Sequence, residues 1–208
     1  MLAHEALGPL RTGFVYGVVG ALVALAADLR FLFLDPNGVQ AWILAAIEGF
    51  RTQLALAAFM LIAIIAAFRV RPTRLDSGVP YRAILLRDCA LAATVVGVLV
   101  GVTLLLTTAL QATLLSGDVR AYAAEAAPRV ASYLEEVRRD LRDPPPSTSA
   151  AEVESSLQPP TLRDLGHSIA NLVLRTILLG SLGAAVGALR GRGRADAESP
   201  RPEKTPEL

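Results

Sequence analysis

An uncharged stretch at residues 89–115 constrains the fold of this chain more than any other feature. It contains no charged side chain, and its one strongly polar residue, Gln111, comes near its end. About 20 predominantly apolar residues in one helix suffice to cross the hydrocarbon core of a bilayer. The stretch therefore predicts a transmembrane helix, and it makes lipid rather than water the main surroundings of the protein.

The overall composition agrees with a membrane protein. Hydrophobic residues make up 53% of the chain and charged residues 19%, whereas a soluble domain carries about 25% charged residues. Mean hydropathy is +0.47. The formal net charge of +1 provides no global basic field, so we expect no nucleic acid as a partner. The expected partner of the apolar surface is the lipid bilayer.

Three further apolar blocks predict three more spans. The expected fold is all-α, an integral membrane bundle of four transmembrane helices within residues 1–190, followed by a disordered tail at 191–208. The expected spans are residues 12–29, 52–69, 89–115 and 165–189.

The first span also allows a different interpretation. Ala24, Leu25 and Ala26 match the small-residue pattern of a signal-peptide cleavage site. Glu5 in the leader and the return of apolar sequence at Phe31 argue against cleavage. An uncleaved first span is the leading expectation.

Residues 39–50 form a shorter apolar segment that follows a turn. Asp35, Pro36 and Gly38 give the turn signal, and Trp42 near the segment's start suits the headgroup region. The segment is too short to cross a bilayer. We expect an interfacial or re-entrant helix, or a helix that runs straight into the second span.

The largest polar segment, residues 116–160, separates the last two spans. Apolar residues recur at helical spacing between 119 and 143, which predicts an amphipathic helix interrupted by Pro128. Its apolar stripe favours packing on the bundle or the membrane surface, with a partner-binding cap as the alternative. Residues 144–160 are predicted to be a flexible connector. Thr161 and Asp164 have the spacing of a capping box at the start of the last helix.

The distribution of charge predicts the orientation. Short arginine-rich loops stay in the cytoplasm. Five arginines lie within residues 69–87, and three more follow the last span at Arg190, Arg192 and Arg194. Residues 116–164 carry six arginines and nine acids, so this segment is expected outside. The prediction is a multi-pass protein of the bacterial inner membrane with both termini cytoplasmic.

Small residues recur four apart on three of the expected spans. Helices in lipid associate through close packing at such residues. The pattern favours packing within one bundle, with a homo-oligomer or a membrane-protein partner as the alternative use. The candidate packing residues are Gly13, Gly17, Gly97, Gly101, Gly183 and Gly187.

The candidate site is the polar face formed by His167, Asn171 and Arg175. These residues are four apart, so they share one face of the last helix. An arginine within a span indicates function unless its charge is paired or reaches the interface. One interpretation is an outward-facing cleft for an anion or small solute, with Asp28, Glu48, Thr107 and Gln111 as nearby polar residues. The other is that Arg175 snorkels to the headgroups.

No motif of an enzyme, a metal site or a nucleotide-binding loop occurs. The single cysteine, Cys89, and the two histidines, His4 and His167, provide no metal-ligand spacing. We therefore assign no catalytic, cofactor-binding or metal-ligating residue and expect no cofactor.

The layout resembles a family of uncharacterised four-span bacterial integral membrane proteins, classed as a domain of unknown function. The features that carry the resemblance are the aromatic and glycine residues Phe14, Tyr16, Gly17 and Gly20, the long outer segment, and the glycine-rich last span. The resemblance implies the four-span topology and no catalytic residues. The sequence favours a non-enzymatic structural or accessory protein, with a small transporter or channel subunit as the alternative and an intramembrane enzyme third.

Overall fold

The structure is a computed structural model that describes residues 8–72, 79–142 and 144–198, and within this part of the chain all regular structure is helical. The elements, in chain order, are α1 (Pro9–Asp28), η1 (Arg30–Leu32), α2 (Ala41–Arg69), α3 (Tyr81–Thr113), α4 (Ser116–Arg139), α5 (Ala150–Leu157) and α6 (Asp164–Glu198).

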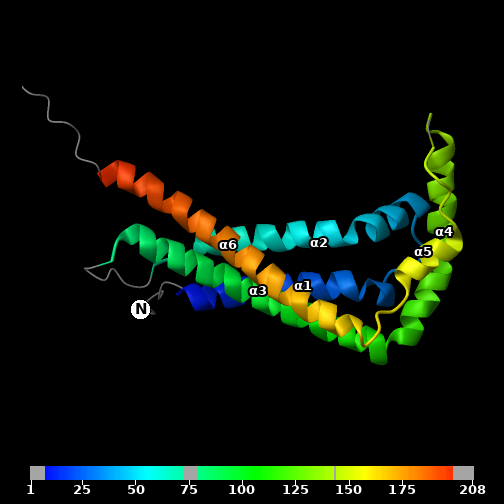
Figure 1. Ribbon diagram of the computed structural model, residues 1–208, viewed down its shortest axis with the longest axis horizontal. Coiled ribbons are helices and arrows are strands. Elements are labelled where there is room, and N and C mark those ends of the chain that lie inside the picture. Colours follow the sequence, from blue (N-terminus) through cyan, green and yellow to red (C-terminus); the bar gives the residue numbers. More distant parts are fainter. Residues whose placement is uncertain (1–7, 73–78, 143, 199–208) are drawn as a thin grey trace, which may run out of the picture.

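Four of these helices are long and apolar enough to cross a bilayer. They are α1, α2, α3 and the Asp164–Arg192 part of α6. The predicted all-α bundle with four candidate spans is therefore confirmed, and the chain is a multi-pass membrane protein. The four helices run side by side, and the start of α1 and the end of α6 lie at the same end of the bundle (Figure 1).

The third span is the central helix of the bundle. α1 and α6 each pack along α3, and α2 contacts α1, α3 and α6. The shared core contains small and β-branched residues from all four spans, including Ala24, Ala63, Val96 and Leu179. Short side chains let the helix backbones approach closely, which increases van der Waals contact where water provides no driving force.

The glycines of α1 and α3 lie where helices meet. A Cβ on Gly13 would lie 2.6 Å from the carbonyl oxygen of Ala92, and one on Gly17 would overlap a methyl carbon of Leu99. Both glycines therefore face α3. Gly97 and Gly101 of α3 face α6 in the same way.

The glycines of α6 extend this close packing toward the other end of the bundle. A Cβ on Gly183 would lie 2.6 Å from the carbonyl oxygen of Cys89, and one on Gly187 would lie 2.7 Å from that of Leu85. All six candidate packing glycines thus contact another helix of the same chain.

The helices α4 and α5 form a cap across one end of the bundle (Figure 1). Their apolar faces pack against Leu44 near the start of α2. Tyr122 and Val130 of α4 and Val153 of α5 belong to this buried cluster. The predicted interruption at Pro128 is wrong, because α4 is continuous through this residue. The amphipathic stripe predicted from the sequence is therefore a packing face on this chain's own bundle.

Two further segments differ from the sequence-based expectations. The first is the predicted flexible connector, which contains α5. Ser149 accepts a hydrogen bond from the Glu152 backbone at 3.2 Å, and the Glu152 carboxylate accepts one from the Ser149 backbone at 2.7 Å. This reciprocal cap satisfies backbone donors that the first turn of a short helix leaves without partners.

The start of α2 agrees with one of the two expectations: residues 41–50 form its first turns, so this segment is an extension of the second span and not a separate interfacial helix. The other difference concerns the end of α6. α6 continues to Glu198, so residues 191–198 are helical, although the sequence predicted a disordered tail from 191. Residues 199–208 lie outside the described part of the chain.

Arg190 joins α6 to the end of α2. Its guanidinium donates hydrogen bonds to the carbonyl oxygens of Ala67 at 2.7 Å and Val70 at 3.2 Å. Carbonyls in the last turn of a helix have no partner within the helix, and a cation there interacts favourably with the helix dipole. Arg190 therefore caps α2 at the end of the bundle opposite α4 and α5.

Candidate functional site: a polar cleft beneath the cap

Two adjoining cavities open between the bundle and the cap. The first, which we call the bundle cavity, has a volume of about 180 Å³ and is lined by residues of α1, α2, α3 and α6. The second, the cap cavity, has a volume of about 340 Å³ and is closed on one side by residues 156–158 and Pro160. Both cavities are lined by Asp28, Arg51, Thr108, Ser168 and Asn171. They therefore form one polar cleft.

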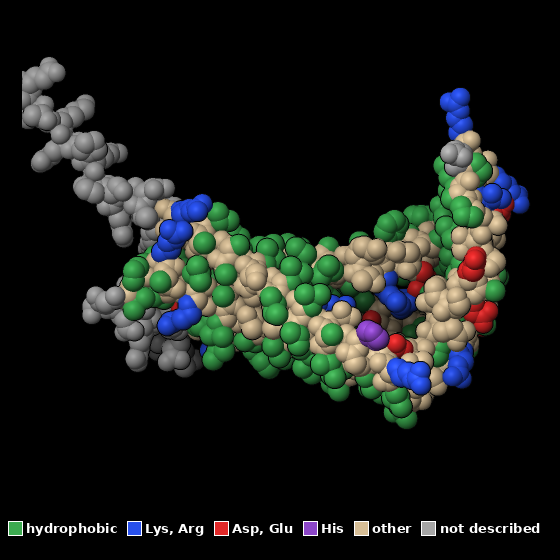
Figure 2. Space-filling view, viewed as in Figure 1, with side chains coloured by type: hydrophobic (Ala, Val, Ile, Leu, Met, Phe, Trp, Pro, Cys, Tyr) green, Lys and Arg blue, Asp and Glu red, His purple; other side chains and the backbone are tan. Residues whose placement is uncertain are grey.

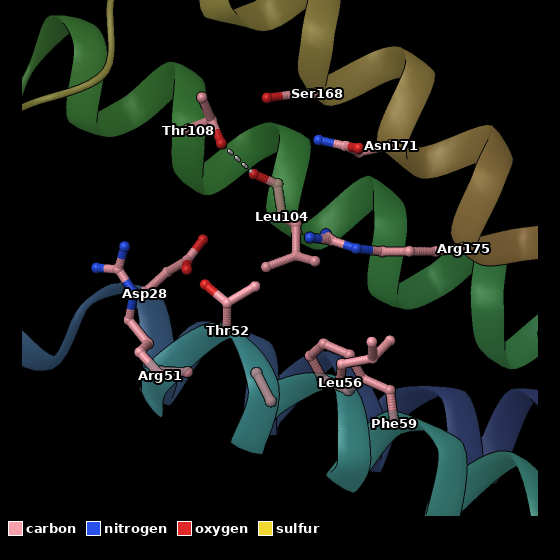
Figure 3. A pocket seen from close by; sticks show the side chains of 12 residues that line it. Asp28, Arg51, Thr52, Leu56, Phe59, Leu104, Thr108, Ser168, Asn171 and Arg175 are labelled. Atoms are coloured by element: carbon pink, nitrogen blue, oxygen red, sulfur yellow. Dashed lines mark hydrogen bonds between the residues drawn. The ribbon is translucent and has the colours of Figure 1, made fainter. Parts of the chain in front are cut away.

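The bundle cavity has polar lining residues beside an apolar wall. Its apolar residues include Leu56 and Phe59 of α2 and Leu104 of α3. Figure 3 shows Ser168, Asn171 and Arg175 directed from α6 toward this space. Figure 2 shows the hollow on the side of the bundle, with arginine side chains visible inside it. A cavity of this kind can hold a small polar group next to a hydrocarbon group.

Contacts between α1 and α3 provide a scale of depth. The two helices run in the same direction: Gly13 packs against Ala92 near one end, and Thr107 donates a hydrogen bond to Asp28 at the other. α1 has 20 residues and is therefore about 30 Å long. This length is close to the thickness of a bilayer's hydrocarbon core, so α3 lies at hydrocarbon depth between Ala92 and Thr107.

Arg175 starts from the middle of this depth range. A Cβ on Gly97 of α3 would lie 2.9 Å from the Cα of Thr176, the residue that follows Arg175. Cα–Cβ bonds tilt toward the N-terminus of a helix, and the N-terminus of α6 lies at the cap end. The Arg175 side chain thus rises toward the cap. Figure 3 shows its guanidinium beside Leu104 in the bundle cavity.

Arg51 and Arg175 have no ion-pair partner within the described part of the chain, although Arg51 lies near enough to Asp28 and Glu48 to interact with their charges. No side chain or carbonyl there forms a hydrogen bond or an ion pair with either guanidinium. A central arginine disfavours membrane insertion by at least about 2.5 kcal/mol. Each guanidinium has five N–H donors. The bundle cavity therefore offers two cations and their donors to a ligand.

Asp28 is the one acid among the residues that line the bundle cavity. Its carboxylate accepts a hydrogen bond from the Thr107 hydroxyl at 2.5 Å, and its backbone carbonyl accepts one from the Gln111 amide at 2.8 Å. These bonds hold the end of α1 against α3. Asp28 keeps its negative charge, and two arginines against one aspartate leave the residues that line the bundle cavity with a formal charge of +1.

A separate charge cluster connects the bundle to the cap. Arg30 of η1 forms an ion pair with Glu48 of α2, and the Tyr122 hydroxyl donates a hydrogen bond to Glu48 at 2.7 Å. The guanidinium of Arg30 also lies 5.8 Å from the centre of the Tyr122 ring. Burial, followed by the hydrogen bond to Glu48, raises the pKa of Tyr122. Arg30 is therefore neutralised, unlike Arg51 and Arg175.

The predicted polar face of α6 lies along this cleft. His167 lines the cap cavity, Asn171 lines both cavities, and Arg175 lines the bundle cavity. Of the four nearby polar residues named from the sequence, Asp28 and Gln111 line the cleft, whereas Glu48 is paired with Arg30 and Thr107 is buried against Asp28.

Two lining residues, Ser168 and Arg51, were missed by the sequence interpretation. Ser168 lies three residues before Asn171 and seven before Arg175, a helical spacing that could have identified it. Arg51 was interpreted as the boundary of the second span. Its place beside α1 and α6 depends on how the helices pack against one another, which no local signal shows.

Within the described residues, no cluster of His, Cys, Asp and Glu has the geometry of a metal site. Comparisons with protein families, with curated proteins and with solved structures found no match for this chain.

Proposed function

We propose that this protein is a non-enzymatic inner-membrane protein that binds an anionic ligand in the cleft, as a transport or solute-capturing subunit. The observation that carries the proposal is Arg175. Its guanidinium lies in a cavity at hydrocarbon depth, and within the described part of the chain it forms no ion pair, although Asp28 lines the same cavity. A bound anion would pair with this guanidinium, and arginine's planar fork suits bidentate binding of phosphate or carboxylate.

The depth of Arg175 favours this interpretation over snorkelling. A snorkelling arginine extends along its helix surface until it reaches the headgroups. Arg175 instead starts level with the middle of α1 and is directed between the helices. The structural or accessory alternative is less well supported, because the glycines that could form an interface with another chain already pack within this one.

The proposed orientation places both termini in the cytoplasm and the cap outside. The end of the bundle opposite the cap carries Arg69, Arg82 and Arg190, and arginine-rich short loops stay in the cytoplasm. The net-acidic segment 116–164 contains the cap. In this orientation the cleft opens near the outer leaflet.

The proposal is tested by thermal unfolding of the purified protein with candidate anions. The probes are inorganic phosphate, succinate, and phosphatidylglycerol nanodiscs compared with phosphatidylcholine nanodiscs. A ligand that binds only the folded state raises its stability by about 2.7 kcal/mol at one hundred times Kd. We expect at least one anion to raise the Tm of the wild type but not that of Arg175→Gln.

Arg120→Gln is the matched control, because Arg120 is exposed on α4 and lines neither cavity. It should respond like the wild type. If no probe shifts the wild type, or if Arg175→Gln responds equally, anion binding in the cleft is refuted and the accessory role becomes the better proposal.

A further inference from the structure

We infer that the ligand of the cleft is an amphiphile with an anionic headgroup, which reaches the bundle cavity sideways from the bilayer between α2 and α6. This inference rests on the proposed function and specifies the class and the route of its ligand. It follows from the side on which the cavity opens, from what closes its outer end, and from the chemistry of its lining.

The opening lies between the cap-side halves of α2 and α6. Near the opposite end of the bundle these helices are joined by the bonds from Arg190 to Ala67 and Val70. Toward the cap they separate, and the bundle cavity occupies the space between them. Thr52 on α2 and Asn171 on α6 both line this cavity and are both exposed.

The hollow is visible on the side of the bundle, next to the cap, in Figure 2. The long helices cross the bilayer, so an opening on their side faces lipid. Large apolar side chains elsewhere on the same two helices are exposed: Leu54 on α2 is 62% exposed, and Leu174 on α6 is 64% exposed. These surfaces are suited to contact with acyl chains.

The cap lies over the outer end of the cleft. Ser156, Leu157 and Pro160 line the cap cavity, which lies above the bundle cavity and shares five lining residues with it. The core around Leu44, Tyr122 and Val153 fixes the cap to α2. A ligand from the outer water phase must therefore pass beneath the cap, whereas a lipid in the adjoining leaflet has direct access.

The lining of the bundle cavity matches a molecule with two different ends. Arg51 and Arg175 provide charged donors for an anionic headgroup, and Ser168 and Asn171 add neutral polar groups. Leu56, Phe59 and Leu104 provide an apolar wall beside them. An inorganic anion would leave this wall without a ligand group, and an uncharged lipid would leave the arginines unpaired.

The test uses the full-length protein in detergent, incubated with equal amounts of phosphatidylglycerol and phosphatidylcholine and examined by native mass spectrometry. We expect the wild type to retain phosphatidylglycerol selectively. Arg175→Gln should retain it about tenfold less well, since a hydrogen bond to a charged group contributes enough for that factor. Arg120→Gln should retain it like the wild type.

A second pair of variants tests the route. Thr52→Trp places a large ring at the opening, and Gln53→Trp places the same ring on the next exposed residue of α2, which does not line the cavity. We expect loss of selective retention in Thr52→Trp alone. Circular dichroism and gel filtration verify that each variant is folded. Equal retention by the two tryptophan variants would refute the lateral route.

The two proposals fail in different ways. If inorganic phosphate stabilises the wild type through Arg175 but phosphatidylglycerol is not retained selectively, the cleft binds a soluble anion and the amphiphile inference is wrong. If phosphatidylglycerol is retained equally by Arg175→Gln, it binds as surrounding lipid, and the inference is wrong again. If neither probe depends on Arg175, both proposals are refuted.

Discussion

Tyr122 connects the cap to the bundle through one hydroxyl group. The side chain is 6% exposed, and its hydroxyl donates to Glu48 at 2.7 Å. Tyr122→Phe removes the hydrogen bond and keeps the ring over Arg30. We expect the free energy of unfolding to fall by about 1.5 kcal/mol, as for other hydrogen bonds to a charged group. Tyr133→Phe on the same helix is the control, because the described structure gives its hydroxyl no hydrogen bond.

The same bond predicts a pH dependence. Burial and the hydrogen bond to Glu48 raise the pKa of Tyr122 above its ordinary value of 10.0. The contribution of Tyr122 to stability is therefore fully present below about pH 10 and is lost as pH rises through the folded-state pKa. Unfolding in mixed micelles should show a difference between wild type and Tyr122→Phe that shrinks above pH 10. A difference that stays constant to pH 12 would contradict the assignment.

Arg190 acts at the opposite end, where it caps α2. Arg190→Met keeps most of the side chain's length but removes the donors to the carbonyls of Ala67 and Val70. We expect a loss of about 1–3 kcal/mol, the usual result of leaving a buried acceptor without a partner, because the Val70 carbonyl loses the guanidinium while the Ala67 carbonyl keeps the Cys89 thiol. Arg192→Met is the matched control, since Arg192 is exposed one half-turn further along α6. Equal losses in the two variants would mean that general charge, rather than capping, is responsible.

At the scale of helices, the contact between α3 and α6 depends on glycine. A Cβ on Gly183 would lie 2.5 Å from the Cβ of Ala93 and 2.6 Å from the carbonyl oxygen of Cys89. Neither atom belongs to a flexible side-chain end, so Gly183→Ala must separate the helices. We expect a loss of about 1–3 kcal/mol, typical of overpacking.

Gly166→Ala is the same substitution in the same helix at an open position, where a Cβ would meet nothing within 4 Å. Alanine is the better helix former, so this variant should be as stable as the wild type or slightly more so. Unfolding in mixed micelles measures both. If Gly183→Ala is also neutral, the close contact of α3 with α6 at this level is wrong.

Helices proved easier to predict than the connections between them. Apolar length alone identified the four spans, because lipid imposes a minimum length on any helix that crosses it. α5 was missed because its Ser- and Ala-rich composition resembles a linker. The capping-box spacing of Ser149 and Glu152, followed by Val153, could have revealed it. For this segment the spacing of the capping residues predicts the helix better than the composition does.

The site was predictable only on one helix. Helical periodicity placed His167, Asn171 and Arg175 on a common face, but periodicity relates only residues of the same helix. That Arg51 lines the same cavity depends on the relative positions of α2 and α6. These positions follow from close packing along α3, which a single sequence does not display. The pairing of Glu48 with Arg30 and Tyr122 was missed for the same reason.

At the scale of the whole molecule, the membrane orientation determines which side of the membrane the cleft serves. The charge distribution predicts that the cap lies outside and the connection between α2 and α3 inside. Single cysteines test this. Cys89→Ala first removes the native thiol, and Ser155→Cys on α5 and Val79→Cys before α3 then place exposed thiols at the two ends of the bundle.

An impermeant thiol reagent applied to intact bacterial cells should label Ser155→Cys but not Val79→Cys, and both should react after lysis. The reverse pattern would place the cap in the cytoplasm, so that the cleft would take its ligand from the inner leaflet. The lysed sample is the internal control, because a thiol that reacts in neither sample is buried rather than sheltered by the membrane. The orientation matters for the cleft because α1 and α3 place Arg175 at mid-depth, with its guanidinium directed toward the cap. Whichever leaflet adjoins the cap is therefore the one from which an amphiphile can reach Arg175.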